Sequence, residues 1–275
     1  MSVQVASEAG SPFKSNEDLA VVGPDRLLIL DGLTQRTESG CVHGVVWYVN
    51  TLASAVMKQD GHSTPVEILS DAVRETASLH AGTCDLSHPG TPAAAVGLVQ
   101  FFSSQIRYLI LGDITLLIDG DERSHVIADD RLARVNASIH AEIDVPAGDS
   151  PEREIGLIRR KHAELAVRNS SDGYWVAAAD PTVVSHAVTG EQSLADVRQL
   201  AVLTDGAARP VDPFKLMDWR GLMSVIAAEG PEAVLRHIRK AEREDSSGRR
   251  WPRNKMSDDA TIIYWRHPSA GGSDS

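Results

Sequence analysis

The sequence predicts an α+β layered domain. Short apolar runs of strand length and longer segments with helical spacing occur in blocks along the chain. Strands and helices do not alternate strictly along the chain, as they would in a doubly wound parallel sheet. Three of the apolar runs end on an aspartate, at Asp31, Asp113 and Asp205, and a fourth run begins just after Asp258. These strand ends are the main indication of a functional site.

The composition is that of an ordinary globular protein, with 42% hydrophobic and 24% charged residues among 275. The formal net charge of −11 argues against general binding to nucleic acid or to an anionic membrane. We expect a cytoplasmic protein, because the sequence has no signal-peptide pattern, no membrane-span-length apolar run and only two cysteines. Without a repeat or a linker, we expect one domain over residues 1–266 and a disordered polar tail at 267–275.

A hairpin is predicted near the N-terminus. Residues 19–22 and 26–31 are apolar and flank a Gly-Pro-Asp turn. Antiparallel pairing would bring Glu17 and Asp18, which enter the first strand, to the same end as Asp31, which leaves the second.

The other elements follow from apolar spacing and from end signals. Helices are predicted over 45–57, from Thr64-Pro65 to Leu79, and over 129–139, 150–167, 219–228 and 231–243. Thr64 with Glu67 three residues later predicts a capping box. Further strands are predicted at 3–5, 93–102, 105–111, 114–119, 174–179, 200–203 and 260–265. The three strands from 93 to 119 are so closely spaced that they predict an antiparallel meander.

Carboxylates at the tips of buried strands predict a metal site. Neighbouring tips concentrate negative charge, and like-charged carboxylates repel and raise each other's pKa until a cation is bound. Glycine follows Asp31 and Asp205, which permits a tight turn and close backbone approach to a ligand. The pattern predicts a hard metal with oxygen ligands. Taken singly, each aspartate has a structural alternative, because Asp-Gly is also ordinary turn chemistry.

Short motifs along nearly the whole chain resemble those of the PPM-type (type 2C) metal-dependent serine/threonine protein phosphatases, in a divergent, bacterial-like form. The motifs are Asn16-Glu17-Asp18, Leu30-Asp31-Gly32, Pro89-Gly90-Thr91, Leu111-Gly112-Asp113, Leu203-Thr204-Asp205-Gly206 and Ser257-Asp258-Asp259-Ala260-Thr261. The resemblance implies a four-layer α/β/β/α sandwich of two antiparallel sheets flanked by helices. It also implies that the substrate is a protein that a cognate kinase phosphorylates on serine or threonine.

The resemblance further implies two divalent cations, Mn²⁺ or Mg²⁺, and a metal-activated water that attacks phosphorus. Asp31 would bridge the two ions and Gly32 would contribute its backbone carbonyl. Asp205 and Asp258 would hold one ion from the other side. The remaining catalytic residues would position metal-bound waters: Glu17 and Asp18.

Three departures from the family pattern affect the rim and the phosphate site. Leu33-Thr34-Gln35 replaces the Met-Gly-Gly-like stretch that usually follows Asp-Gly. A phosphate-binding arginine usually precedes the Glu-Asp pair, whereas the nearest cation here is Lys14. Some members bind a third metal through the Gly-Asp aspartate, here Asp113, and a second aspartate whose position holds Arg209. Asp113 is therefore either a third metal ligand or a turn residue, and Lys14 and Arg209 are the phosphate-binding candidates.

Two other functions remain open. One is a catalytically weak relative that regulates or binds a phosphorylated partner, which the altered rim and the missing arginine suggest. Retention of Asp31, Asp205 and Asp258 argues against it. The other is an enzyme for a small phosphate ester, which the sequence does not separate from a protein phosphatase.

Two further patterns receive structural interpretations. Cys41-x-His43 is too short and solitary for zinc, which needs about four ligands, so we expect packing at a helix entry. No catalytic role is assigned to His43, His62, His80 or His88. Four basic residues before Asp258 are expected to lie in a solvated loop, with a positive lip for phosphorylated substrate as the alternative: Arg249, Arg250, Arg253 and Lys255.

Overall fold

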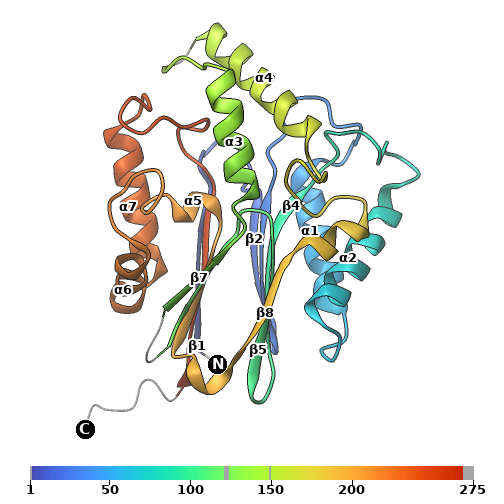
Figure 1. Ribbon diagram of the computed structural model, residues 1–275, viewed down its shortest axis with the longest axis vertical. Helices are drawn as coiled ribbons and strands as arrows, with labels where there is room; N and C mark the ends of the chain where they lie inside the picture. The colour runs from blue at the N-terminus through green and yellow to red at the C-terminus, as the bar shows by residue number, and fades with distance from the viewer. Residues whose placement is uncertain (1, 121–123, 149, 269–275) are drawn as a thin grey trace.

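The computed structural model describes residues 2–120, 124–148 and 150–268. Two antiparallel five-stranded sheets pack face to face, which confirms the predicted α+β sandwich (Figure 1). One sheet contains, in spatial order, β1 (Ser2–Glu8), β10 (Ala260–Arg266), β9 (Gln199–Leu203), β6 (Thr115–Asp119) and β7 (Ser124–Ala128). The other contains β2 (Asp18–Val22), β3 (Arg26–Gly32), β4 (Ala94–Phe101), β5 (Gln105–Leu111) and β8 (Val188–Ser193).

Helices form the two outer layers and cover one end of the sandwich (Figure 1). The β2–β8 sheet is covered by α1 (Gly44–Lys58) and α2 (Pro65–His80), and the β1–β7 sheet by α6 (Trp219–Glu229) and α7 (Pro231–Glu244). The predicted capping box at the start of α2 is present. Two further helices lie across the end of the sandwich: α3 (Arg131–Glu142) and α4 (Pro151–Ala166). No described helix has the length and apolarity needed to cross a bilayer.

Strand β3 shows how the layers position the site. Leu28 and Leu30 pack against α1 and α2, whereas Leu27 and Ile29 pack between the two sheets. Successive side chains of a strand point to opposite faces, and here the helices bury one face of β3 and the second sheet buries the other. This burial on both faces explains the continuous apolar run. Burying each of these side chains contributes roughly 1.5–3 kcal/mol. By the same alternation, Asp31 lies on the face that looks toward the other sheet.

The predicted three-strand meander is wrong at its third strand. β4 and β5 pair as expected, but β6 pairs with β9 in the opposite sheet. The chain crosses over after Gly112, whose φ of +88° suits glycine, and Ile114 and Leu116 then pack between the sheets. The crossing places Asp113 between the two layers.

Three other strand and loop predictions need correction. Residues 174–179 form isolated bridges, Ala94 with Ala177 and Arg168 with Tyr174, instead of a strand. β7 and β8 were not predicted, because they lie at sheet edges, are partly exposed and lack the long apolar run of the central strands. The segment after Asp205, where no helix was predicted, begins as the short helix α5 (Asp205–Ala208). Most of the predicted tail, from residue 269 on, lies outside the described residues.

Candidate active site

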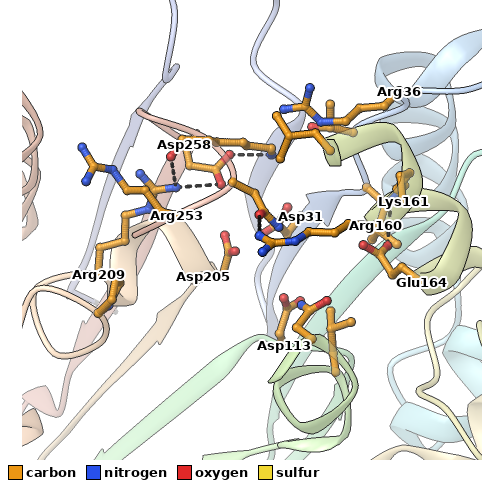
Figure 2. Close-up of a pocket in the computed structure, with 18 of the residues that line it drawn as sticks. Asp31, Arg36, Asp113, Arg160, Lys161, Glu164, Asp205, Arg209, Arg253 and Asp258 are labelled. Atoms are coloured by element: carbon orange, nitrogen blue, oxygen red, sulfur yellow. Dashed lines mark hydrogen bonds and ion pairs between the residues drawn. The ribbon is translucent and has the colours of Figure 1, made fainter. Parts of the chain in front are cut away.

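The strand-end aspartates converge at the end of the sandwich that α3 and α4 cover. β3 ends with Asp31 and Gly32, Asp113 lies in the turn after β5, Asp205 opens α5 directly after β9, and Asp258 precedes β10. All five residues line one cavity of about 310 Å³. Figure 2 shows the carboxylates of Asp31, Asp113 and Asp205 facing a common space. The structure therefore brings together every residue that was predicted as a metal ligand.

Asp18 and Glu17 reach this end of the sandwich from the hairpin, as its pairing predicted. Asp18 is paired with Asp31 across β2 and β3. Its Oδ2 accepts a hydrogen bond of 2.9 Å from the Thr204 hydroxyl, which links the two sheets beneath the cavity. Glu17 accepts a short hydrogen bond from Thr34 and lines an adjoining groove rather than the cavity itself.

Burial and mutual repulsion raise the pKa values of these carboxyl groups. Burial, and then the charge of Asp205, raises the pKa of Asp113 to about 7. Burial, opposed by hydroxyl hydrogen bonds and reinforced by Asp205, raises the pKa of Asp18 to about 8. The pKa of Asp31 is raised well above its usual range by burial and by the neighbouring carboxylates. This set of oxygen donors fits a hard divalent cation, because the charge of the cation would offset the repulsion among the carboxylates.

We expect the metal-free protein to lose stability as the pH rises from about 5 to about 8. The folded pKa values of about 7 for Asp113 and about 8 for Asp18 exceed the ordinary aspartate value. In that range the native state therefore binds more protons than the unfolded state, so the free energy of unfolding falls with rising pH. Urea unfolding in EDTA at several pH values measures this slope, and added Mn²⁺ should reduce it. A stability that rises over this range would contradict the prediction.

Two positively charged side chains, Lys255 and Arg209, pair with the carboxylate of Asp258. Lys255 Nζ lies 2.6 Å from Asp258 Oδ1, and Arg209 Nη2 lies 3.1 Å from Oδ2. Arg209 is also held by Glu242, whose Oε1 lies 2.6 Å from Nη1, and its side chain is 8% exposed. Although Arg209 borders the cavity, its guanidinium is directed at two carboxylates. This geometry favours positioning of Asp258 over the predicted contact with phosphate.

Lys255 was missed as a site residue, because the basic loop was expected to be solvated. That expectation is wrong for two of its residues. Arg253 is 5% exposed and its Nη1 lies 2.7 Å from Asp245 Oδ2. Lys255 projects into the cavity, and the charges of Asp258 and Asp205 raise its pKa against the opposing effect of burial. Its place three residues before Asp258 was the available signal, since a lysine and an aspartate at that spacing can pair within one turn.

The rim of the cavity carries further cations. Lys14, the other predicted phosphate-binding residue, is exposed and lies in the adjoining groove, outside the cavity. Arg36 borders both the cavity and the groove, and its Nη1 makes a 3.4 Å contact with the exposed Glu154. Figure 2 shows Arg36, Arg160 and Lys161 together on one side of the aspartates. Arg36 was not predicted, because the stretch before it departs from the family pattern.

Comparison with known proteins gives structural matches alone: no family model and no curated protein matches the sequence. The catalytic domain of the serine/threonine phosphatase PstP, solved with two manganese ions, matches over 96% of both chains, with a TM-score of 0.57 and 15% identity. The PstP/Ppp phosphatase of Mycobacterium tuberculosis matches with a TM-score of 0.58 and 14% identity, over 97% of this chain and 99% of that chain.

Stp1, a serine/threonine phosphatase from Staphylococcus aureus, matches with a TM-score of 0.58 and 13% identity, over 96% of this chain and 94% of its own. At these identities the likeness establishes the fold, and it extends over nearly the full length of each chain. This chain has the fold of the bacterial PPM-type serine/threonine phosphatases.

Proposed function

We propose that this protein is a metal-dependent phosphoester hydrolase that acts on phosphoserine or phosphothreonine in proteins. The observation that carries the proposal is the convergence of Asp31, Asp113, Asp205 and Asp258 on one cavity. Burial and repulsion raise the pKa values of Asp31, Asp113 and Asp205. Carboxyl groups crowded in this way are costly without a cation, so a purely structural role explains them poorly. The phosphatase fold supports the same conclusion.

The donor set suits Mn²⁺ or Mg²⁺, which prefer oxygen ligands. Asp31, the Gly32 carbonyl, Asp205 and Asp258 would hold two such ions, and Asp113 lines the same cavity. Bound there, the ions supply Lewis-acid charge at phosphoryl oxygens and a nucleophilic water at neutral pH.

Other side chains orient these groups. The Arg209 guanidinium fixes one oxygen of Asp258, and Glu242 fixes Arg209 in turn. The Thr34 and Thr204 hydroxyls donate to the carboxylates of Glu17 and Asp18, respectively. We propose that Glu17 and Asp18 position water through these oriented carboxylates.

The shape and charge of the rim favour a peptide substrate over a small ester. The adjoining groove of about 660 Å³ shares Thr34, Arg36 and Lys255 with the cavity, so a chain lying in the groove passes the aspartates. Lys14 lies in the same groove and Arg36 borders both hollows. We propose that these two cations bind the phosphorylated segment, with Arg36 able to contact a phosphate oxygen through its planar fork.

The test is hydrolysis of an aryl phosphate and of a phosphothreonine peptide, first in EDTA and then with added Mn²⁺ or Mg²⁺. We expect turnover of both substrates, loss of turnover in EDTA and recovery with metal. Turnover of the aryl phosphate alone would instead indicate a small-ester enzyme. No turnover and no metal binding would refute the proposal.

One observation favours a second candidate, a catalytically weak protein that binds phosphorylated partners. Asp258 is already neutralised by Lys255 and Arg209, so part of the carboxylate charge needs no metal. Calorimetry separates the two candidates: phosphopeptide binding in EDTA, without turnover in Mn²⁺, would establish the second.

A further inference from the structure

A second group of potential ligands lies outside the candidate active site, where α1 begins and α2 ends. Cys41 and His43 directly precede α1, His80 is the last residue of α2, and Cys84 follows one turn later. One ligand atom from each side chain lies within 4.8 Å of the corresponding atoms of the other three. The isolated Cys-x-His pair thus gains two partners that lie far from it in the sequence.

The distances within the quartet fit a tetrahedral metal site. Cys41 Sγ lies 3.6 Å from His43 Nδ1 and 3.5 Å from His80 Nδ1, and Cys84 Sγ lies 3.3 Å from His43 Nδ1. In a tetrahedron with zinc–sulfur bonds of about 2.3 Å and zinc–nitrogen bonds of about 2.0 Å, sulfur and nitrogen are about 3.5 Å apart. We propose that Cys41, His43, His80 and Cys84 bind one zinc ion.

The environment of the four side chains supports a bound cation. The two thiols are not joined in a disulfide, yet their sulfur atoms are 2.9 Å apart, closer than the roughly 3.7 Å expected of two zinc ligands, so binding requires a small separation of the sulfurs. His80 is 1% exposed, and its Nε2 has no hydrogen-bond partner among the described residues. A metal bond at Nδ1 would offset part of the cost of burying this ring, and the Nε2–H would stay unpaired.

The backbone holds the quartet in place. The Cys84 N–H donates to the His80 carbonyl at 3.0 Å, so the helical turn continues past α2 and puts both side chains on one side. Trp47, one turn into α1, stacks on His43 with ring centroids 4.2 Å apart and packs on His80 at 5.1 Å. Four protein ligands leave no open coordination position, which is typical of a structural zinc site and not of a catalytic one.

The position of the quartet gives the zinc ion a specific structural task. Cys41 belongs to the loop between β3 and α1, which also carries Thr34 and Arg36 at the rim of the candidate active site. The Asp85 N–H donates to the Gly40 carbonyl at 2.8 Å, so the loop after α2 already contacts this rim loop. A zinc ion would fasten the two loops together and thereby fix the rim.

Cobalt substitution tests the site without relying on phosphatase activity. The protein is purified under reducing conditions, its zinc content is measured, and Co²⁺ is then exchanged into the metal-free protein. We expect about one tightly bound zinc ion per chain and a cobalt spectrum with thiolate charge-transfer bands and intense tetrahedral d–d bands. Removal of zinc should lower the melting temperature of the unmutated protein, because binding energy to the folded state is folding energy.

Variants assign the ligands. Cys41→Ser and Cys84→Ser should abolish the tetrahedral spectrum, and His43→Ala or His80→Ala should weaken cobalt binding and change the d–d bands. His62→Ala is the matched control, because His62 is an exposed histidine in the loop between α1 and α2. Asp205→Asn is the second control, because it weakens metal binding at the candidate active site and leaves the four proposed zinc ligands intact. Both controls should keep the full cobalt spectrum.

Three results would overturn the inference. The first is a reduced, folded protein that takes up no zinc and gives no thiolate–cobalt band. The second is a cobalt spectrum that is unchanged when both histidines are replaced. The third is a mass lower by two hydrogens in the protein isolated without reductant, with unreactive thiols and no metal after reduction, which would identify Cys41 and Cys84 as a disulfide pair instead.

Discussion

Replacement of Asp205 by asparagine is expected to lower metal-dependent phosphate-ester hydrolysis by about a thousandfold or more, because the charge stabilisation that a catalytic metal supplies is worth several kcal/mol. Asp205 stands at the start of α5 and faces Asp31 and Asp113 across the cavity. An amide keeps the shape of the side chain but removes the negative charge that a hard cation requires. Hydrolysis of an aryl phosphate over a range of Mn²⁺ concentrations measures the loss.

The same variant should not unfold the metal-free protein. Burial and the charge of Asp258 raise the pKa of Asp205, so removing its charge relieves repulsion. We expect urea unfolding in EDTA near pH 8 to show an unchanged or increased free energy of unfolding. Asp212→Asn is the matched control, because Asp212 also borders the cavity but is exposed and pairs with Lys215. An Asp205→Asn protein that folds normally and retains full activity would refute the assignment of the site.

Replacement of Lys255 by methionine is expected to have opposite effects on stability and on metal affinity. In the metal-free protein the variant should lose about 1–3 kcal/mol of stability, because Asp258 loses a charged hydrogen-bond partner. The lysine side chain is 32% exposed, so solvent screens part of this interaction. The affinity for Mn²⁺ should rise about tenfold, because an ammonium ion no longer competes for the same carboxylates.

Two measurements check this pair of effects: urea unfolding in EDTA and calorimetric titration with Mn²⁺. Lys215→Met is the matched control, since Lys215 and Asp212 form an ion pair of the same spacing whose side chains are 72% and 73% exposed. The control should change neither quantity by more than the small amount typical of a surface pair. Weaker Mn²⁺ binding by the Lys255 variant would show that the lysine assists the metal site instead of competing with it.

Local patterns in the sequence were enough to predict much of the fold. The apolar runs, the Gly-Pro-Asp turn and the cap at Thr64 each depend on residues that are close in the chain, and the hairpin and α2 form as expected. Because strand geometry alone places both ends of a hairpin together, Asp18 and Asp31 could be predicted as neighbours. The motifs at Asp205 and Asp258 added the rest of the acidic cluster through their resemblance to a family.

Contacts between distant segments produced what the sequence did not reveal. Strand β6 joins the opposite sheet because Ile114 and Leu116 are buried between the layers, which no local pattern distinguishes from a third hairpin strand. The Cys-x-His pair lacked visible partners because His80 and Cys84 reach it only when α2 packs beside α1. Lys255 resembles a solvated lysine until the fold surrounds it with aspartates. Tertiary packing brings these charges and ligands close together, and it depends on contacts between segments that are far apart in the chain.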